Sequence, residues 1–262
     1  MKKKLLVIAA AFMLMFSFAG QVMAAFSPMD GDLIQVVYVN GGSGAEVATD
    51  LGSALSNFTT LNSVTTDTLL TNTVNFSSAF SGLSMSQLNV AYFIYDGTDD
   101  FWVSGPTTGT QTNAAGQMSS AASSFTAVLN YYKSLSGTLS SDGTSTQAIG
   151  LSSALNSFYK IMDGNGVNVG NFGGFIKSPL GSGVTSLAGL STTGYVDQYL
   201  YYYDSSVANT SSNGIAIADI RTWSNGSTEI IPLVSTPLPA AVWLLGSGLV
   251  GLVGIRRRRE TA

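Results

Sequence analysis

The sequence predicts a mainly β body, antiparallel and sandwich-like, with two amphipathic helices inserted between Asn113 and Met162. Short β-branched and aromatic runs are separated by turn-forming clusters, and polarity comes from Ser, Thr, Asn and Gly, with only 10% charged residues. Long exposed helices would need more Glu and Lys. If the two helices instead pack on one face of a single sheet, the class is α+β.

Three hairpins are expected along the body. Each pairs two apolar or β-branched runs across a cluster of Gly, Asn or Asp. The run from Leu88 to Tyr95 is apolar on both faces, which predicts a central strand. The hairpins are expected at 33–39 with 45–50, at 88–95 with 101–103, and at 214–223 with 228–232.

Helical periodicity is expected in two segments. Apolar residues recur every three or four positions from Asn113 to Leu135, which predicts one helix. A second helix is predicted from Thr144 to Met162, with Ile149, Leu155 and Phe158 facing inward and glycines after Asp163 ending it. The Gly- and Ser-rich residues 168–193 are expected to form a surface loop or short irregular strands.

Two residue types are missing from the sequence, and their absence excludes several kinds of catalytic and metal-binding site. The chain has no Cys and no His, which excludes Ser-His-Asp and Cys-His nucleophile systems, Cys or His zinc sites, and haem or iron–sulfur ligation by these residues. We therefore predict no catalytic residues, no metal site and no cofactor. A glycan hydrolase using two carboxylates is a weaker alternative, because the body's only glutamates, Glu46 and Glu229, lie in no recognisable motif.

The charge of the body is strongly negative once the two ends are set aside. Seven of the 11 Lys and Arg residues lie in the first four positions or in the cluster at 256–259, and 14 acids lie between the ends. The four remaining cations then give the body a net charge of 4 − 14 = −10. Such a surface repels phosphate backbones, so we expect no nucleic-acid partner.

The first 24 residues have the pattern of a secretory signal peptide. Three lysines follow Met1, an apolar run of 14 residues extends from Leu5 to Phe18, and Val22-Met23-Ala24 forms a small-residue cleavage site. A membrane anchor is the alternative, but the run is short for a hydrocarbon core of about 30 Å. Signal peptidase is therefore an expected partner.

The last 26 residues combine three parts. Pro237, Leu238, Pro239 and Ala240 form a motif whose prolines keep the chain extended, which suits a peptidase substrate. The apolar stretch from Ala241 to Ile255 can enter a bilayer as a helix. Arg256, Arg257, Arg258 and Arg259 then remain cytoplasmic under the positive-inside rule. A permanent single-span anchor is the alternative.

This tail resembles the PEP-CTERM sorting signal, in the variant with Pro-Leu-Pro-Ala. The match is carried by the residues from Pro237 to Gly248 and covers only the last 25 or so positions. Thr236 and Leu238 depart from the Val and Glu of the named forms. The resemblance implies processing by an exosortase, a membrane cysteine protease, in a Gram-negative bacterium that makes extracellular polysaccharide.

The organisation that follows is a signal peptide (1–24), a single β-rich extracellular domain (25–232), a linker (233–236) and the sorting signal (237–262). We expect the chain to pass through the inner membrane, stay there transiently, and reach the cell surface or the extracellular matrix. The predicted function is a structural protein of an exopolysaccharide or biofilm matrix.

A row of tyrosines supports an alternative function. Tyr195, Tyr199, Tyr201 and Tyr203 fall on one face of a predicted strand, where phenol rings could stack on sugars of an exopolysaccharide. With Trp102 and Trp223 they suggest a carbohydrate-binding module. Buried tyrosines of a β core are the simpler interpretation, because Tyr is an ordinary strand former.

Two acidic turns are candidate calcium sites. Asp96, Asp99 and Asp100 follow the central strand, and Asp163 with Asn165 follows the second predicted helix. Neither has the ligand spacing of a known calcium loop, and Asp is common in turns and caps. We expect a turn and a helix cap.

Overall fold

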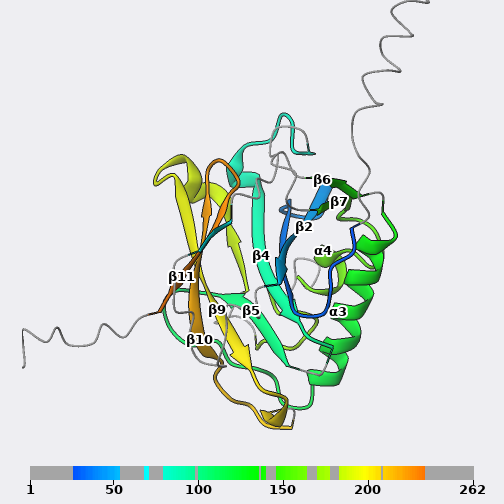
Figure 1. Ribbon diagram of the computed structural model, residues 1–262, viewed down its shortest axis with the longest axis vertical. Coiled ribbons are helices and arrows are strands. Elements are labelled where there is room, and N and C mark those ends of the chain that lie inside the picture. The colour runs from blue at the N-terminus through cyan, green and yellow to red at the C-terminus, as the bar shows by residue number, and fades with distance from the viewer. Residues whose placement is uncertain are drawn as a thin grey trace, which may run out of the picture. The chain divides into compact units, whose positions relative to one another are not determined.

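The computed structural model describes residues 26–53, 68–70, 79–97, 100–135, 137–139, 146–163, 170–177, 183–207 and 209–233 (Figure 1). The predicted signal peptide, the motif at 237–240, the apolar stretch and the arginines at 256–259 lie outside these residues. So do Asp99 and residues 164–166 of the predicted acidic turns. Within the described part of the chain, no helix is long and apolar enough to cross a membrane.

The described elements are mostly short strands. The helices are α3 (Met118–Lys133) and α4 (Phe158–Ile161), with 3-10 turns η1 (Met85–Gln87), η2 (Leu187–Ser191) and η3 (Ser205–Val207). The strands are β1 (Asp32–Val39), β2 (Ala45–Ser53), β3 (Thr68–Leu70), β4 (Leu88–Tyr95), β5 (Phe101–Gly105), β6 (Gly137–Leu139), β7 (Thr146–Leu151), β8 (Val184–Ser186), β9 (Tyr195–Tyr203), β10 (Ile215–Trp223) and β11 (Thr228–Pro232).

All of these strands belong to one antiparallel sheet. Its order is β3-β11-β10-β9-β5-β4-β1-β2-β7-β6, and β8 pairs with β4 beside β5. The three predicted hairpins are confirmed as β1 with β2, β4 with β5, and β10 with β11. The mainly β, antiparallel class is therefore confirmed.

The sheet curls so that its two halves face each other. Strands β9, β10 and β11 form one half, β1, β2 and β4 the other, and β5 joins them by pairing with both β4 and β9 (Figure 1). The sandwich-like prediction is corrected in this respect: the two packed layers are halves of one continuous sheet. The helices pack on one face of that sheet, which is the arrangement of the α+β alternative.

Two hydrophobic cores follow from this arrangement. The first lies between the two halves of the sheet and includes Val37, Val90, Leu200 and Ile220. The second lies between the β1–β2–β4 half and the helices, and it includes Phe93 and Phe125. Because β4 separates the two cores, seven of its eight residues are buried, which confirms the predicted central strand.

The helix prediction is confirmed for α3 and wrong for most of the second segment. Met118, Ala121, Ala122, Phe125, Val128 and Tyr132 are buried on the inner face of α3, as expected. The segment from Thr144 to Met162 instead gives strand β7 and a single turn of helix, α4.

Tertiary contacts explain why residues 146–151 form a strand and not a helix. Residues 146–151 pair with β2 along its open edge, which outweighs local helix periodicity. Of the residues expected to face inward, Ile149 is 42% exposed and Leu155 is 83% exposed, and Phe158 is buried.

The Gly- and Ser-rich segment is also more ordered than expected where it is described. Residues 183–193 form β8, which pairs with β4, and the turn η2, whose Leu187 and Leu190 enter the first core. Short strands were expected here, but burial of the segment was not.

A buried polar cluster joins the two halves of the sheet across the first core. The hydroxyl of Tyr92 on β4 lies 2.7 Å from that of Thr222 on β10 and 3.1 Å from that of Thr228 on β11. The Gln35 amide on β1 donates to Tyr92 and to Thr228, at 2.7 and 3.0 Å. These side chains are at most 1% exposed, so each needs its partners within the protein.

Replacing Tyr92 by Phe should therefore destabilise the curled sheet. The change leaves buried hydroxyl and amide groups short of partners, and we expect the free energy of unfolding to fall by about 1–3 kcal/mol. Urea denaturation of the full chain measures this. The control is Tyr199→Phe on half-buried Tyr199, for which we expect a change within about 0.5 kcal/mol. Equal losses in the two variants would contradict a joining role for Tyr92.

Candidate functional site

The structure divides the predicted tyrosine row into a buried and an open part. Tyr201 and Tyr203 are 3% and 2% exposed and lie in the core on the helix side of the sheet. The Tyr201 hydroxyl donates to the Pro106 carbonyl at 2.8 Å, and the Tyr203 ring packs edge-on against Phe175. Neither ring can stack on a sugar in this structure. Tyr195 and Tyr199 are half-buried. Tyr199 packs against the margin of that core, and Tyr195 is not part of it.

The open part belongs to a wider surface, which we call the β9–β11 face. It is the continuation of the helix-covered side of the sheet past the helices. Pairing between strands places Tyr195 opposite Trp223, Asp197 opposite Arg221, and Arg221 opposite Glu229. The face comprises Leu69, Tyr195, Asp197, Tyr199, Asp219, Arg221, Trp223, Glu229 and Ile231.

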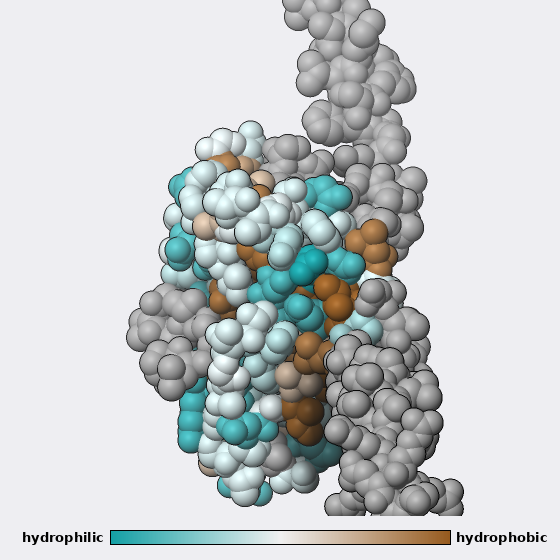
Figure 2. All heavy atoms as spheres, turned by 90° about the vertical axis from the view of Figure 1, so that its left-hand side faces the viewer, coloured by the Kyte–Doolittle hydropathy of each residue, from teal (hydrophilic) through white to brown (hydrophobic). Residues whose placement is uncertain are grey.

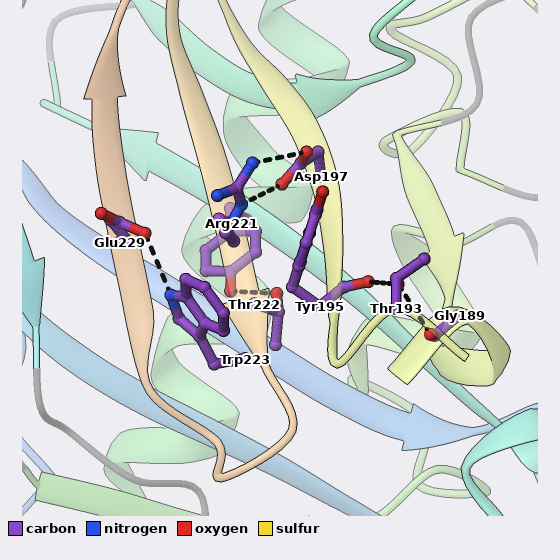
Figure 3. A network of polar contacts seen from close by, with 9 residues as sticks. Gly189, Thr193, Tyr195, Asp197, Arg221, Thr222, Trp223 and Glu229 are labelled. Carbon is purple, nitrogen blue, oxygen red and sulfur yellow. Dashed lines mark hydrogen bonds and ion pairs between the residues drawn. The ribbon is translucent and has the colours of Figure 1, made fainter. Parts of the chain in front are cut away.

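Arg221 is the centre of this face. Its Nε and one terminal nitrogen donate to the two carboxylate oxygens of Asp197, at 2.8 and 3.1 Å (Figure 3). The guanidinium carbon also lies 3.9 Å from the ring centroid of Tyr195 and 5.4 Å from that of Trp223. A bidentate pair and cation–π contacts hold a planar guanidinium well. These contacts join β9 and β10 on their outer side.

Trp223 is held from several directions. Its indole nitrogen donates to Glu229 Oε2 at 3.0 Å, and its ring lies 5.4 Å from that of Tyr195 (Figure 3). The side chain also lines a pocket of about 350 Å³ with Leu69, Ser224, Asn225, Ser227 and Glu229. The pocket lies where the β10–β11 hairpin turns. An aromatic wall beside a few oriented polar groups is typical of small-ligand sites.

Trp102, the other tryptophan considered for sugar binding, lies elsewhere. It is 3% exposed in the first core, with its ring 4.9 Å from that of Tyr202. The sequence alone does not separate the two tryptophans, because each lies in a predicted strand. The structure separates them, because Trp102 is buried inside the curled sheet and Trp223 is only half-buried.

Negative charge dominates the β9–β11 face. Asp197, Asp219 and Glu229 accompany the single cation Arg221. The pKa of Asp219 is raised to about 6, first by burial and then by the neighbouring Asp197 and Glu229, and Arg221 only partly opposes this. The face therefore offers hydrogen-bond acceptors and repels anions.

The other glutamate of the body has a structural position that the sequence did not reveal. Glu46 on β2 is fully buried beneath α4, where it accepts hydrogen bonds from the Tyr132 hydroxyl at 2.5 Å and from the backbone N–H groups of Phe158 and Tyr159 at 2.8 and 2.9 Å. It thus satisfies the first amides of that helix turn. Glu46 and Glu229 lie on β2 and β11, with five strands between them in the sheet.

The described carboxylates of the acidic turns accept hydrogen bonds from other parts of the chain. Asp100 accepts hydrogen bonds from the Tyr202 hydroxyl and the Ser205 backbone, at 3.0 and 2.8 Å. Asp163 accepts the Gly170 N–H at 2.9 Å. Among the described residues, no group of three or more acidic side chains is arranged to hold a metal ion.

The buried carboxylates make stability depend on pH. Burial raises the pKa of Glu46 to about 7 and those of Asp50 and Asp163 to about 6, and hydrogen bonds only partly oppose this. Because these values exceed the ordinary 4.5 and 3.8, folding favours the protonated forms. The stabilisation is complete below the ordinary values and is lost as the pH rises through 6 and 7.

We therefore expect the melting temperature of the full chain to be higher near pH 5 than at pH 8. Glu46 alone can contribute about 3 kcal/mol to the difference. The Glu46→Gln variant should be less stable overall, since an amide donor replaces an acceptor, but its melting temperature should change less with pH. Asp50→Asn should also flatten the profile, and Asp30→Asn on exposed Asp30 is the control. A melting temperature that rises from pH 5 to pH 8 would contradict this electrostatic description.

Comparison of the chain with known protein families, with curated proteins and with solved structures finds no match in any of the three. The chemistry of the site therefore rests on its own residues. These are an aromatic pair held by one arginine, three surrounding carboxylates, and a pocket at the β10–β11 turn.

Proposed function

We propose that the chain is an exported, non-catalytic structural component of an extracellular polysaccharide matrix, released at its C-terminal motif by an exosortase. The observation that supports this is the position of the boundary between the folded domain and the C-terminal tail. Contacts within the chain divide it after Pro232, the last residue of β11, into Met1–Pro232 and Leu233–Ala262. The motif begins at Pro237, after four intervening residues.

This spacing suits removal of the tail. Every described strand ends before Leu233, so cleavage at the motif removes no strand from the sheet. In this proposal the four residues of the predicted linker separate the motif from the last strand, which suits access by a peptidase. The signal peptide directs export in this proposal, and the arginine cluster holds the tail at the inner membrane until it is cut.

Intact-mass analysis of extracellular and membrane fractions tests the proposal. We expect the extracellular protein to lack both the residues before Ala25 and the tail beyond the motif, and the full tail to persist in the membrane fraction of a strain without the exosortase. Replacing Pro237 and Pro239 by Ala should also retain the tail. An extracellular protein of the wild-type strain that carries residues 241–262 would overturn the sorting proposal.

A second candidate function is polysaccharide binding through the β9–β11 face. What favours it is Trp223, half-buried at a pocket and held by Tyr195, Arg221 and Glu229. The C–H groups of a pyranose ring pack on the electron-rich face of such an aromatic side chain. An aromatic side chain that is already held loses little conformational entropy on binding.

Retention on the host's own exopolysaccharide tests this second candidate. In co-sedimentation of the full chain with the isolated polymer, Tyr195→Ala should reduce the bound fraction severalfold. Tyr202→Phe, which changes a tyrosine on the opposite, inner side of the same strand, is the matched control. Equal retention of the wild type and Tyr195→Ala would remove the face from consideration.

A further inference from the structure

We propose that the pocket at the β10–β11 turn binds one neutral pyranose unit of a glycan and excludes uronic acids. The inference rests on the second candidate function and names its location and ligand class. The pocket is lined by Leu69, Trp223, Ser224, Asn225, Ser227 and Glu229. Its volume of about 350 Å³ lies within the range of roughly 300–1,000 Å³ of small-ligand sites.

The pocket is built on a rigid hairpin. The Trp223 N–H donates to the Ser227 carbonyl at 2.9 Å, and the Gly226 N–H donates to the Trp223 carbonyl at 2.8 Å. The Ser224 N–H donates to the Gly194 carbonyl at 2.8 Å, which ties the turn to the start of β9. The lining groups are thus positioned before a ligand arrives, which lowers the entropic cost of binding.

The polar groups suit hydroxyl pairs of a sugar. Asn225 Oδ1 accepts the Ser227 N–H at 3.0 Å and the Ser227 hydroxyl at 2.7 Å, which orients the amide and its NH₂ donors. Glu229 receives the indole N–H on one carboxylate oxygen and presents a second oxygen as an acceptor. A donor and an acceptor at one rim match a vicinal diol, in which each hydroxyl can both donate and accept.

Charge selects against an anionic sugar. The lining residues include a carboxylate and no cation, and Arg221, the arginine of the described part of the chain, is already engaged by both oxygens of Asp197. The body carries a net charge of −10, so a uronate also meets long-range repulsion. A carboxylate in this pocket would be desolvated without a cationic partner.

The leucine in the lining adds an apolar contact. Leu69 on β3 is 57% exposed and pairs in register with Glu229 on β11. It therefore lies beside Glu229 at the edge of the pocket. A pyranose ring presents C–H groups on its faces and hydroxyls around its rim, so an aromatic and an aliphatic side chain can contact the ring while polar groups meet the hydroxyls.

Calorimetric titration of the full chain in a sugar-free zwitterionic detergent tests the inference. The probes are hexasaccharides of β-1,4-linked glucose, β-1,4-linked mannose and β-1,4-linked galactose, with hexaguluronate as the anionic probe. We expect at least one neutral probe to bind and hexaguluronate to bind at least tenfold more weakly. Trp223→Ala should weaken neutral binding at least tenfold.

Two further variants keep the test decisive. Asn225→Asp retains the oxygen that holds the Ser227 turn but replaces the NH₂ donors by negative charge, so it should fold and bind at least fivefold more weakly. Leu155→Ala removes an exposed apolar side chain outside the pocket lining and should bind like the wild type.

No binding of any neutral probe, equal binding of hexaguluronate, or wild-type binding by both pocket variants would overturn the inference. Retention on whole exopolysaccharide together with any of these results would leave polysaccharide binding standing and reject only this pocket.

Discussion

Strands β1 and β4 at the centre of the sheet are buried on both faces, so the fold must exclude water from both faces. Every residue of β1 and seven of eight in β4 are buried. The curl of the sheet brings β9–β11 over one face, and α3 and α4 cover the other. With no disulfide available, burial of these two faces is the main source of stability.

The same constraint leaves one surface free. The core on the helix side includes Tyr201 and Tyr203 at the end of β9, but it does not include Tyr195, Arg221 or Trp223. In Figure 1 the helices lie on the side of β1, β2 and β4. Figure 2 views the molecule from the side of these strands, where hydrophilic and weakly polar residues predominate around a band of apolar ones. Arg221, Tyr195 and Trp223 stabilise this outer side by stacking rather than by burial. A surface held in this way can remain open to a ligand.

The scarcity of cations shapes the interior as well. The body has only four Lys and Arg residues for 14 acids, so the buried carboxylates Glu46 and Asp163 are satisfied by hydrogen bonds from hydroxyl and backbone groups. Desolvation then outweighs those bonds and raises the pKa values. Composition and burial together thus favour the protonated form of these carboxyl groups in the folded chain.

The hairpins and α3 could be predicted because alternation, turn residues and helical periodicity are local. The fate of residues 146–151 could not, since it depends on the open edge of β2, and the division of the tyrosine row depends on where the helix layer ends. Hydrogen exchange of the full chain, with and without a bound neutral hexasaccharide, most directly tests the claim that the uncovered β9–β11 face is the binding surface. We predict slower exchange in residues 222–229 on binding and no change in α3; slowing in α3 with residues 222–229 unchanged would contradict it.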